Sequence, residues 1–224
     1  MPADRLLPDR MAAVLAVVYL IFNQGYTDRS DLAAEAIRLG RLLAELMVDE
    51  AEVYGLLSLM LLHDSRREAR VVDGQLVPLA EQDRSREDRA KVAAGGAALE
   101  RALALRPAPG PYVLQAAIAS LQAEEEIDWD EIAVLYERLQ RLTRSPVVAL
   151  NRAVAVAEAG APQRALELVD SLELGDYRYV HSTRAELLRR LGRQEEARAA
   201  FEHALRLAAT DPERRFLARR LAGL

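Results

Sequence analysis

The feature that most constrains this chain is a repeat of small residues every 32 positions in its second half. Two sets recur at this interval: Ala133, Ala165 and Ala197, and, twelve residues before each of them, Leu121, Ala153 and Ala185. Gly160 and Gly192 are also 32 residues apart, and we expect each to close the first helix of its unit. A fixed period of this length is typical of stacked helical hairpins, in which small residues stand where two helices come close. The repeat therefore predicts an array of helix pairs over residues 111–224.

The last repeat unit, residues 187–212 (LLRRLGRQEEARAAFEHALRLAATDP), matches the tetratricopeptide pattern. A Leu-Gly turn is followed five positions later by Ala197, then by the aromatic Phe201 and by Ala204. The two earlier units are degenerate: they keep an alanine at the Ala197 position, but Val169 and Glu137 stand at the aromatic position. The pattern predicts that neighbouring helices are antiparallel and joined by short loops.

Helix-forming residues dominate the whole chain, since its 224 residues include 40 Ala and 37 Leu but only 17 Val and 5 Ile. We expect helices at about 9–22, 30–47, 49–65, 87–105, 112–124, 129–142, 146–159, 162–172, 178–191, 194–208 and 212–222. The first helix should stop at Asn23-Gln24-Gly25. The expected fold is all-α, a right-handed superhelix of antiparallel helical hairpins. The Pro/Gly cluster at 106–111 predicts a seam between an N-terminal half (1–106) and the repeats (111–224), within one continuous domain.

Residues 66–86 break the helical pattern. Asp73-Gly74 stands between the apolar pairs 71–72 and 76–77, which is a hairpin signal, so we expect a short two-stranded excursion or an ordered loop. Opposite charges flank this segment at 63–70 and 81–86. We expect Arg–carboxylate pairs between the two flanks to tie the excursion down; the alternative is a polar surface for a partner.

The residue inventory does not indicate an active site. The chain has no cysteine, which excludes disulfides and a thiol nucleophile, and its three histidines lack metal-motif spacing. It also lacks a phosphate-binding loop and a GxSxG turn. We therefore expect a non-enzymatic protein with no catalytic residues, metal or cofactor. The net charge of −5 argues against nucleic-acid binding.

The apolar run at 11–22 is shorter than the roughly 20 residues that cross a membrane. We interpret it as a buried helix, and we expect a cytoplasmic protein without a signal peptide.

Four stretches are unusual for a plain scaffold: 19–26, 63–70, 81–86 and 145–152. With the only tryptophan, they supply the candidate interaction or clamp residues, which are Asn23, Tyr26, His63, Asp64, Arg66, Arg67, Arg70, Asp83, Arg84, Arg86, Trp129, Asn151 and Arg152. We expect Trp129 to be a packing anchor. Asn151, on an otherwise apolar helix, should bond to the backbone of a neighbouring hairpin.

Six segments carry a family resemblance: LPDRMAAVLAVVYLIFNQGY, LLSLMLLHDSRREAR, EQDRSREDR, GPYVLQAAIASLQAE, DWDEIAVLYERL and SPVVALNRAVAVAEAG. In this order they resemble the C-terminal extension of one group of extracytoplasmic-function RNA polymerase sigma factors. In that group a tetratricopeptide-like helical domain follows the two sigma domains.

The resemblance implies a regulatory role in transcription initiation. The implied partners are sigma domains two and four and RNA polymerase, on which the extension would dock in place of a separate anti-sigma factor. Promoter contacts belong to the sigma domains, so no direct DNA contact is expected from this sequence. The alternative is a small-molecule sensor whose ligand, bound between the two halves near Tyr26, His63 and Arg84, shifts the docking equilibrium.

Overall fold

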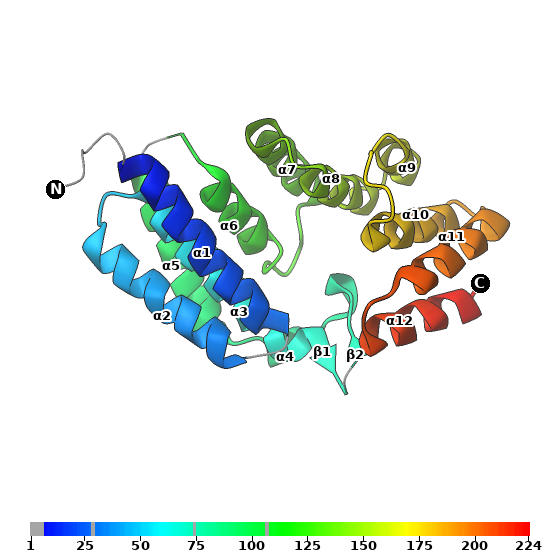
Figure 1. The fold of residues 1–224 in the computed structure, drawn as a ribbon, viewed down its shortest axis with the longest axis horizontal. Coiled ribbons are helices and arrows are strands. Elements are labelled where there is room, and N and C mark those ends of the chain that lie inside the picture. Colours follow the sequence, from blue (N-terminus) through cyan, green and yellow to red (C-terminus); the bar gives the residue numbers. More distant parts are fainter. Residues whose placement is uncertain (1–6, 28–29, 74, 106–107) are drawn as a thin grey trace. The chain divides into compact units, whose positions relative to one another are not determined.

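The computed structural model describes residues 7–27, 30–73, 75–105 and 108–224, and these residues form twelve α-helices and one two-stranded sheet (Figure 1). The all-α class is thereby confirmed. The helices are α1 Leu7–Thr27, α2 Ser30–Leu46, α3 Ala51–Ser65, α4 Arg67–Arg70, α5 Arg89–Ala104, α6 Pro111–Leu121, α7 Trp129–Thr143, α8 Pro146–Glu158, α9 Pro162–Asp170, α10 Arg178–Arg190, α11 Gln194–Leu207 and α12 Asp211–Ala222. The strands are β1 Val71–Val72 and β2 Gln75–Leu76, and 3₁₀ turns follow at Leu79–Glu81 and Arg84–Arg86. None of these helices is both long enough and apolar enough to cross a membrane.

The chain divides into two compact units, of which the first comprises residues 1–68 and 83–125. Helix α3 lies at its centre and packs against α1, α2, α5 and α6. Almost every residue of α3 is buried, as expected for a helix that is apolar on all sides. Large side chains fill the core around it, among them Phe22, Leu56 and Met60, each at most 1 % exposed.

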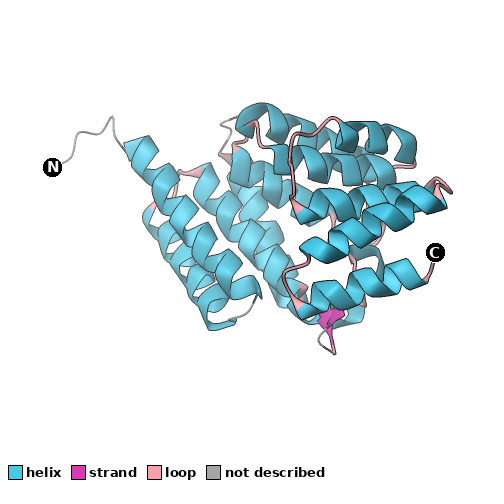
Figure 2. Cartoon of the chain, turned by 45° about the vertical axis from the view of Figure 1, so that its right-hand side comes forward, coloured by secondary structure: helices cyan, strands magenta, loops and turns pink. Residues whose placement is uncertain are grey.

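The second unit comprises residues 69–82 and 126–224. Helices α7 to α12 follow one another as packed pairs, and the β1–β2 hairpin lies against α12 (Figure 2). In the hairpin Val71 pairs with Leu76 and Val72 with Gln75, which confirms the expected two-stranded excursion. Asp73 adopts a φ of 52°, in the left-handed region that such a tight turn requires.

The 32-residue repeat corresponds to equivalent positions in successive hairpins. Ala153, Ala165, Ala185 and Ala197 are all fully buried, so these small residues stand where helices meet, whereas Ala133 is half-buried. Both repeat glycines are left-handed and close their helices in the same way. The amide after Gly160 donates to the carbonyl of Val156, at 3.1 Å, and the amide after Gly192 donates to that of Leu188, at 2.9 Å.

The boundary between the units lies after residue 125 and not at the predicted seam 106–111, of which residues 106–107 lie outside the described part of the chain. Helix α6 belongs with the first unit because α3 holds its N-terminus. The Glu52 carboxylate accepts hydrogen bonds from the amides of Tyr112, at 2.9 Å, and Val113, at 3.1 Å. Gly55 lies directly beneath the same turn, where a Cβ would be 2.6 Å from the Val113 nitrogen.

The predicted stop of the first helix at Asn23-Gln24-Gly25 is wrong, since α1 continues to Thr27. Gly25 is buried inside the helix and faces the backbone of α2. A Cβ at this position would lie 2.1 Å from the nitrogen of Ala33. The glycine therefore permits close approach of the two helices and does not end the first one.

We expect Gly25→Ala to lower the free energy of unfolding by about 3 kcal/mol, because the added methyl group overlaps the backbone of α2. The matched control is Gly96→Ala on α5, where a Cβ would meet nothing within 4 Å. That change should raise stability by about 0.5–1 kcal/mol through helix propensity. Urea denaturation followed by circular dichroism measures both, and equal effects of the two substitutions would contradict the close approach of α1 and α2.

Candidate functional site

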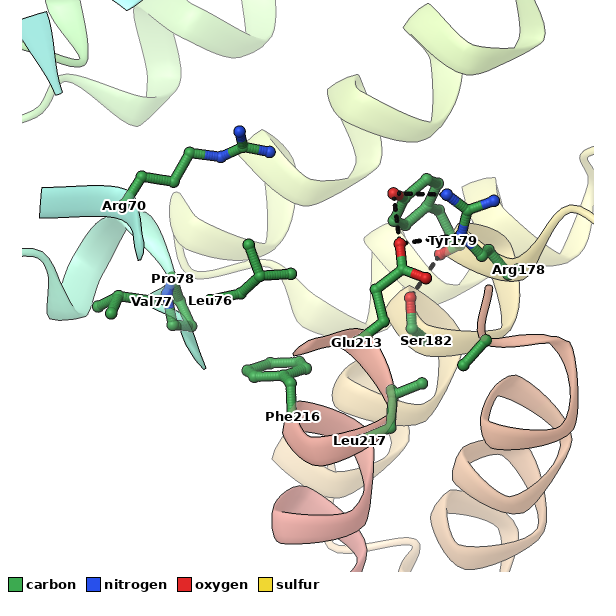
Figure 3. Close-up of a pocket in the computed structure, with 11 residues that line it drawn as sticks. Arg70, Leu76, Val77, Pro78, Arg178, Tyr179, Ser182, Glu213, Phe216 and Leu217 are labelled. Carbon is green, nitrogen blue, oxygen red and sulfur yellow. Dashed lines mark hydrogen bonds and ion pairs between the residues drawn. The ribbon is translucent and has the colours of Figure 1, made fainter. Parts of the chain in front are cut away.

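A cavity of about 280 Å³ opens in the second unit between the hairpin, the start of α10 and α12 (Figure 3). One side is apolar and the other is polar. The apolar side is lined by Leu76, Val77, Pro78, Phe216 and Leu217, and the polar side by Arg178, Tyr179, Ser182 and Glu213, whereas Arg70 lies on the hairpin side (Figure 3). The cavity thus joins a hydrophobic floor to a cluster of charged and hydroxyl groups.

Glu213 is positioned by the N-terminus of α12. The Thr210 hydroxyl caps this helix by accepting a hydrogen bond from the Glu213 amide. The Glu213 carboxylate in turn accepts one from the Thr210 amide, which completes a capping box. Oε2 of Glu213 accepts from the amides of Ala209, at 3.1 Å, and Thr210, at 3.3 Å. The capping box leaves Oε1 to face α10.

Oε1 of Glu213 binds the first turn of α10. It accepts hydrogen bonds from Arg178 Nε, at 3.1 Å, and from the Tyr179 hydroxyl, at 2.9 Å (Figure 3). The Arg178 guanidinium also donates to the Tyr179 oxygen, at 3.0 Å, and lies over the Tyr179 ring. The three side chains form one network that joins α10 to α12.

Burial and the interactions of this network shift the pKa values of Glu213 and Tyr179 in opposite directions. Burial alone would raise the pKa of Glu213, but hydrogen bonds from Tyr179 and Ala209 and the charge of Arg178 outweigh burial and lower it. Burial and the bond to the Glu213 carboxylate raise the pKa of Tyr179. At neutral pH Glu213 is therefore ionised and Tyr179 is protonated, so the Glu213 carboxylate meets the positive charge of Arg178 and the neutral hydroxyl of Tyr179.

The hydroxyl groups that line the cavity have hydrogen-bond partners within the protein. Ser182, its one aliphatic hydroxyl, donates to the backbone carbonyl of Tyr179, at 3.1 Å. The Tyr179 side of the cavity remains accessible, since this residue is 42 % exposed. An apolar group could enter against Phe216 and Leu217 while its polar end meets Arg178.

We expect Glu213→Gln to destabilise the protein by about 1–2 kcal/mol at neutral pH, because it removes a charged hydrogen-bond acceptor. A carboxyl whose pKa is lower in the folded than in the unfolded state stabilises the fold above its unfolded value, about 4.3, and loses this effect as the pH falls through the folded value. The difference in unfolding free energy should therefore shrink below about pH 4.5. Thermal or urea unfolding across pH measures it. The exposed Glu202→Gln on α11 is the control, and a difference that grows towards acid pH would contradict the assignment.

The hairpin segment is held by α12. Arg220 Nη2 binds Glu81 Oε1 at 2.5 Å, and Arg219 donates to Gln75. The predicted clamp between 63–70 and 81–86 is not formed by Asp83 or Arg84, because nearer partners satisfy both. Asp83 accepts from the amide and hydroxyl of Ser85.

Arg84 binds the end of α6. Its guanidinium donates to the carbonyl oxygens of Ala123, at 2.9 Å, and Gln122, at 3.5 Å. A cation here satisfies carbonyls that a helix C-terminus leaves unpaired. Arg86 is exposed, and its charge contributes to lowering the pKa of Asp83, after the two bonds from Ser85.

Five residues meet where α3 ends, and four of them were predicted candidates. The ring of Tyr26 contacts that of His63 edge-on, at 5.8 Å, and the guanidinium of Arg67 lies 5.5 Å from its centre. Arg67 also binds Asp64, at 2.7 Å, and Asp64 binds Lys91, the only lysine, at 3.0 Å. This cluster, Tyr26, His63, Asp64, Arg67 and Lys91, joins the ends of α1 and α3 to the start of α5.

The structure separates the other candidates. Asn23 is exposed and hydrogen-bonds the Tyr19 hydroxyl, whereas Arg66 is buried where α3 ends. Arg70 lines the cavity in the second unit. Trp129 is half-buried as the first residue of α7.

Two candidates lie on α8. The prediction for Asn151 is wrong, since its side chain is exposed and makes no hydrogen bond to any described residue. Arg152 is half-buried and links α8 to α7 by binding Gln140, at 3.4 Å, and Glu137, at 3.5 Å.

A row of exposed apolar side chains on α1 was missed by sequence reasoning. Val14, Val17 and Leu20 on α1 are 44 %, 55 % and 66 % exposed and lie three residues apart, so they form a row along one helix face, which we name the α1 row. The expectation of a buried helix is wrong for this face; Leu15, Val18 and Phe22 on the opposite face are buried. The sequence signal for this exposed face was the apolar run at 11–22. Its apolar residues occur on all sides of the helix, and not only on the stripe that packs against the core.

Comparisons with known proteins agree with the fold. Residues 10–103 match a family of unknown function, DUF6596. An uncharacterized protein of Rhizobium meliloti (strain 1021) is 44 % identical over 223 residues, covering 93 % of this chain; the chain spans about half, 52 %, of that relative's length. The crystal structure of a thermophilic TPR protein of Thermus thermophilus superposes with a TM-score of 0.58 at 19 % identity, covering 93 % of this chain and 95 % of that one. The chain is thus TPR-like in fold.

Proposed function

We propose that this chain is a non-enzymatic protein-interaction domain that regulates a bacterial sigma factor by docking on its sigma domains two and four or on RNA polymerase. The sigma-factor part rests on the resemblance of the six sequence segments. The length of the Rhizobium meliloti relative, about twice the span matched here, is consistent with further domains in such a polypeptide. The TPR-like fold is typical of proteins that present surfaces to other proteins.

The observation that carries the docking proposal is the α1 row. Large contiguous apolar patches on a protein surface commonly mark a site where a partner binds. No charged residue lies between Met11 and Phe22, so no charged side chain from this part of α1 borders the α1 row. Helix α1 is fixed on its other face by the core of the first unit, so the row is held rigidly.

We expect the purified chain to co-purify with sigma domains two and four, or with core RNA polymerase, from its own organism. Val17→Glu and Leu20→Glu place a charge in the α1 row and should weaken this binding at least about tenfold, since burying an unpaired charge is costly. The control is Leu142→Glu on α7, which is 56 % exposed. Binding is read by calorimetry. Failure of the wild type to bind either partner, or equal effects of all three substitutions, would contradict the proposal.

A second candidate function, small-molecule sensing, is favoured by the cavity beside Tyr179. The predicted location near Tyr26, His63 and Arg84 is less suitable, because Arg84 is bound to α6 and Tyr26 to His63. A metabolite that raises the melting temperature of the wild type but not of Tyr179→Ala would support sensing at the cavity. Equal shifts for both proteins would exclude that location.

A further inference from the structure

Two of the three histidines come together in the second unit. His181 lies in the first turn of α10 and His203 near the end of α11. Because these two helices are antiparallel neighbours, the two positions fall at the same end of the pair (Figure 1). Asp176 lies in the loop that leads into α10, directly after Gly175, whose φ of +49° turns the chain.

The side chains are close enough to share one ion. The two imidazole rings are stacked with centres 4.1 Å apart, and His203 Nε2 lies 3.8 Å from a carboxylate oxygen of Asp176. One ligand atom from each of the three residues lies within 4.8 Å of the others. Ligand atoms around a tetrahedral metal with bonds of about 2.1 Å stand about 3.4 Å apart. Small rotations of these side chains would bring the ligand atoms from separations of up to 4.8 Å to about 3.4 Å.

The surroundings of His181 favour metal binding. Burial and the neighbouring His203 lower the pKa of His181. Its Nε2 lies 3.2 Å from the carbonyl oxygen of Gly175. In the tautomer that donates this bond, Nδ1 keeps its lone pair, and a backbone carbonyl on the other ring nitrogen is the support that metal-binding histidines commonly have.

We propose that Asp176, His181 and His203 form a binding site for a divalent transition-metal ion of the Zn²⁺ type. Two imidazoles and one carboxylate suit Zn²⁺, Co²⁺ or Ni²⁺ better than Mg²⁺ or Ca²⁺, which prefer oxygen ligands. The ion would tie the loop before α10 to α11 and so brace the last complete hairpin of the array. Sequence reasoning missed the site because its ligands are spread over 28 positions and match no metal motif.

The test is calorimetric titration of the tag-free chain with Zn²⁺, and with Mg²⁺ as a second probe. We expect one Zn²⁺ site, no Mg²⁺ binding, and a loss of Zn²⁺ affinity of at least about tenfold in His181→Ala and His203→Ala. Asp176→Asn, which keeps the shape of the side chain, should also weaken binding. His63→Ala is the matched control, because it removes the remaining histidine from the other unit.

A second measurement guards against variants that merely misfold. Co²⁺ bound to the wild type should give the visible absorption of a low-coordinate complex, and Zn²⁺ should raise the melting temperature of the wild type but not of Asp176→Asn. The proposal is overturned if Zn²⁺ does not bind, or if it binds the three variants as tightly as the wild type. Loss of binding in His63→Ala alone would also overturn it. None of these readouts depends on docking to sigma domains.

Discussion

Close contacts between helices in this protein are made at residues that have no side chain or only a methyl group, and much of the packing depends on them. In the first unit Gly25 of α1 meets the backbone of α2, and Gly55 of α3 meets the start of α6. In the second unit fully buried alanines recur every 32 residues, at positions such as 165 and 197. A larger residue at any of these points would force backbones apart, because close-packed interiors have little room to relax.

Contacts between small side chains bring helices together but hardly select which helices meet or where they end. Charged hydrogen bonds at the helix termini determine which helices meet and where they end. Glu52 on α3 caps α6, Asp64 joins the end of α3 to Lys91 on α5, and Glu213 joins the start of α12 to α10. Each bond satisfies groups that a helix end or a partly buried charge would otherwise leave unpaired. Arg219 and Arg220 extend the same scheme by holding the hairpin segment on α12.

The sequence predicted nearly all the helices, the hairpin and the all-α class, because helical spacing and turn residues are local signals. It failed where a residue acts on a distant partner. The residues around Gly25 predict a helix stop, but this glycine makes room for a contact with Ala33. The Pro/Gly cluster at 106–111 predicted a seam, and nothing in it indicates that Glu52 binds the start of α6. The candidate residues at the end of α3 do meet, yet the cavity network and the histidine pair were missed, since their members lie on different helices and match no sequence motif. The α1 row was misread as core because an apolar run does not reveal which face a neighbour covers.

We propose that the domain acts through α1, which packs against α3 on its buried face. Hydrogen–deuterium exchange of the chain, alone and with sigma domains two and four, tests this most directly. The account predicts that the partner slows exchange in residues 10–21 and leaves α7 and α8 unchanged. Slowed exchange confined to the second unit, with α1 unaffected, would contradict it.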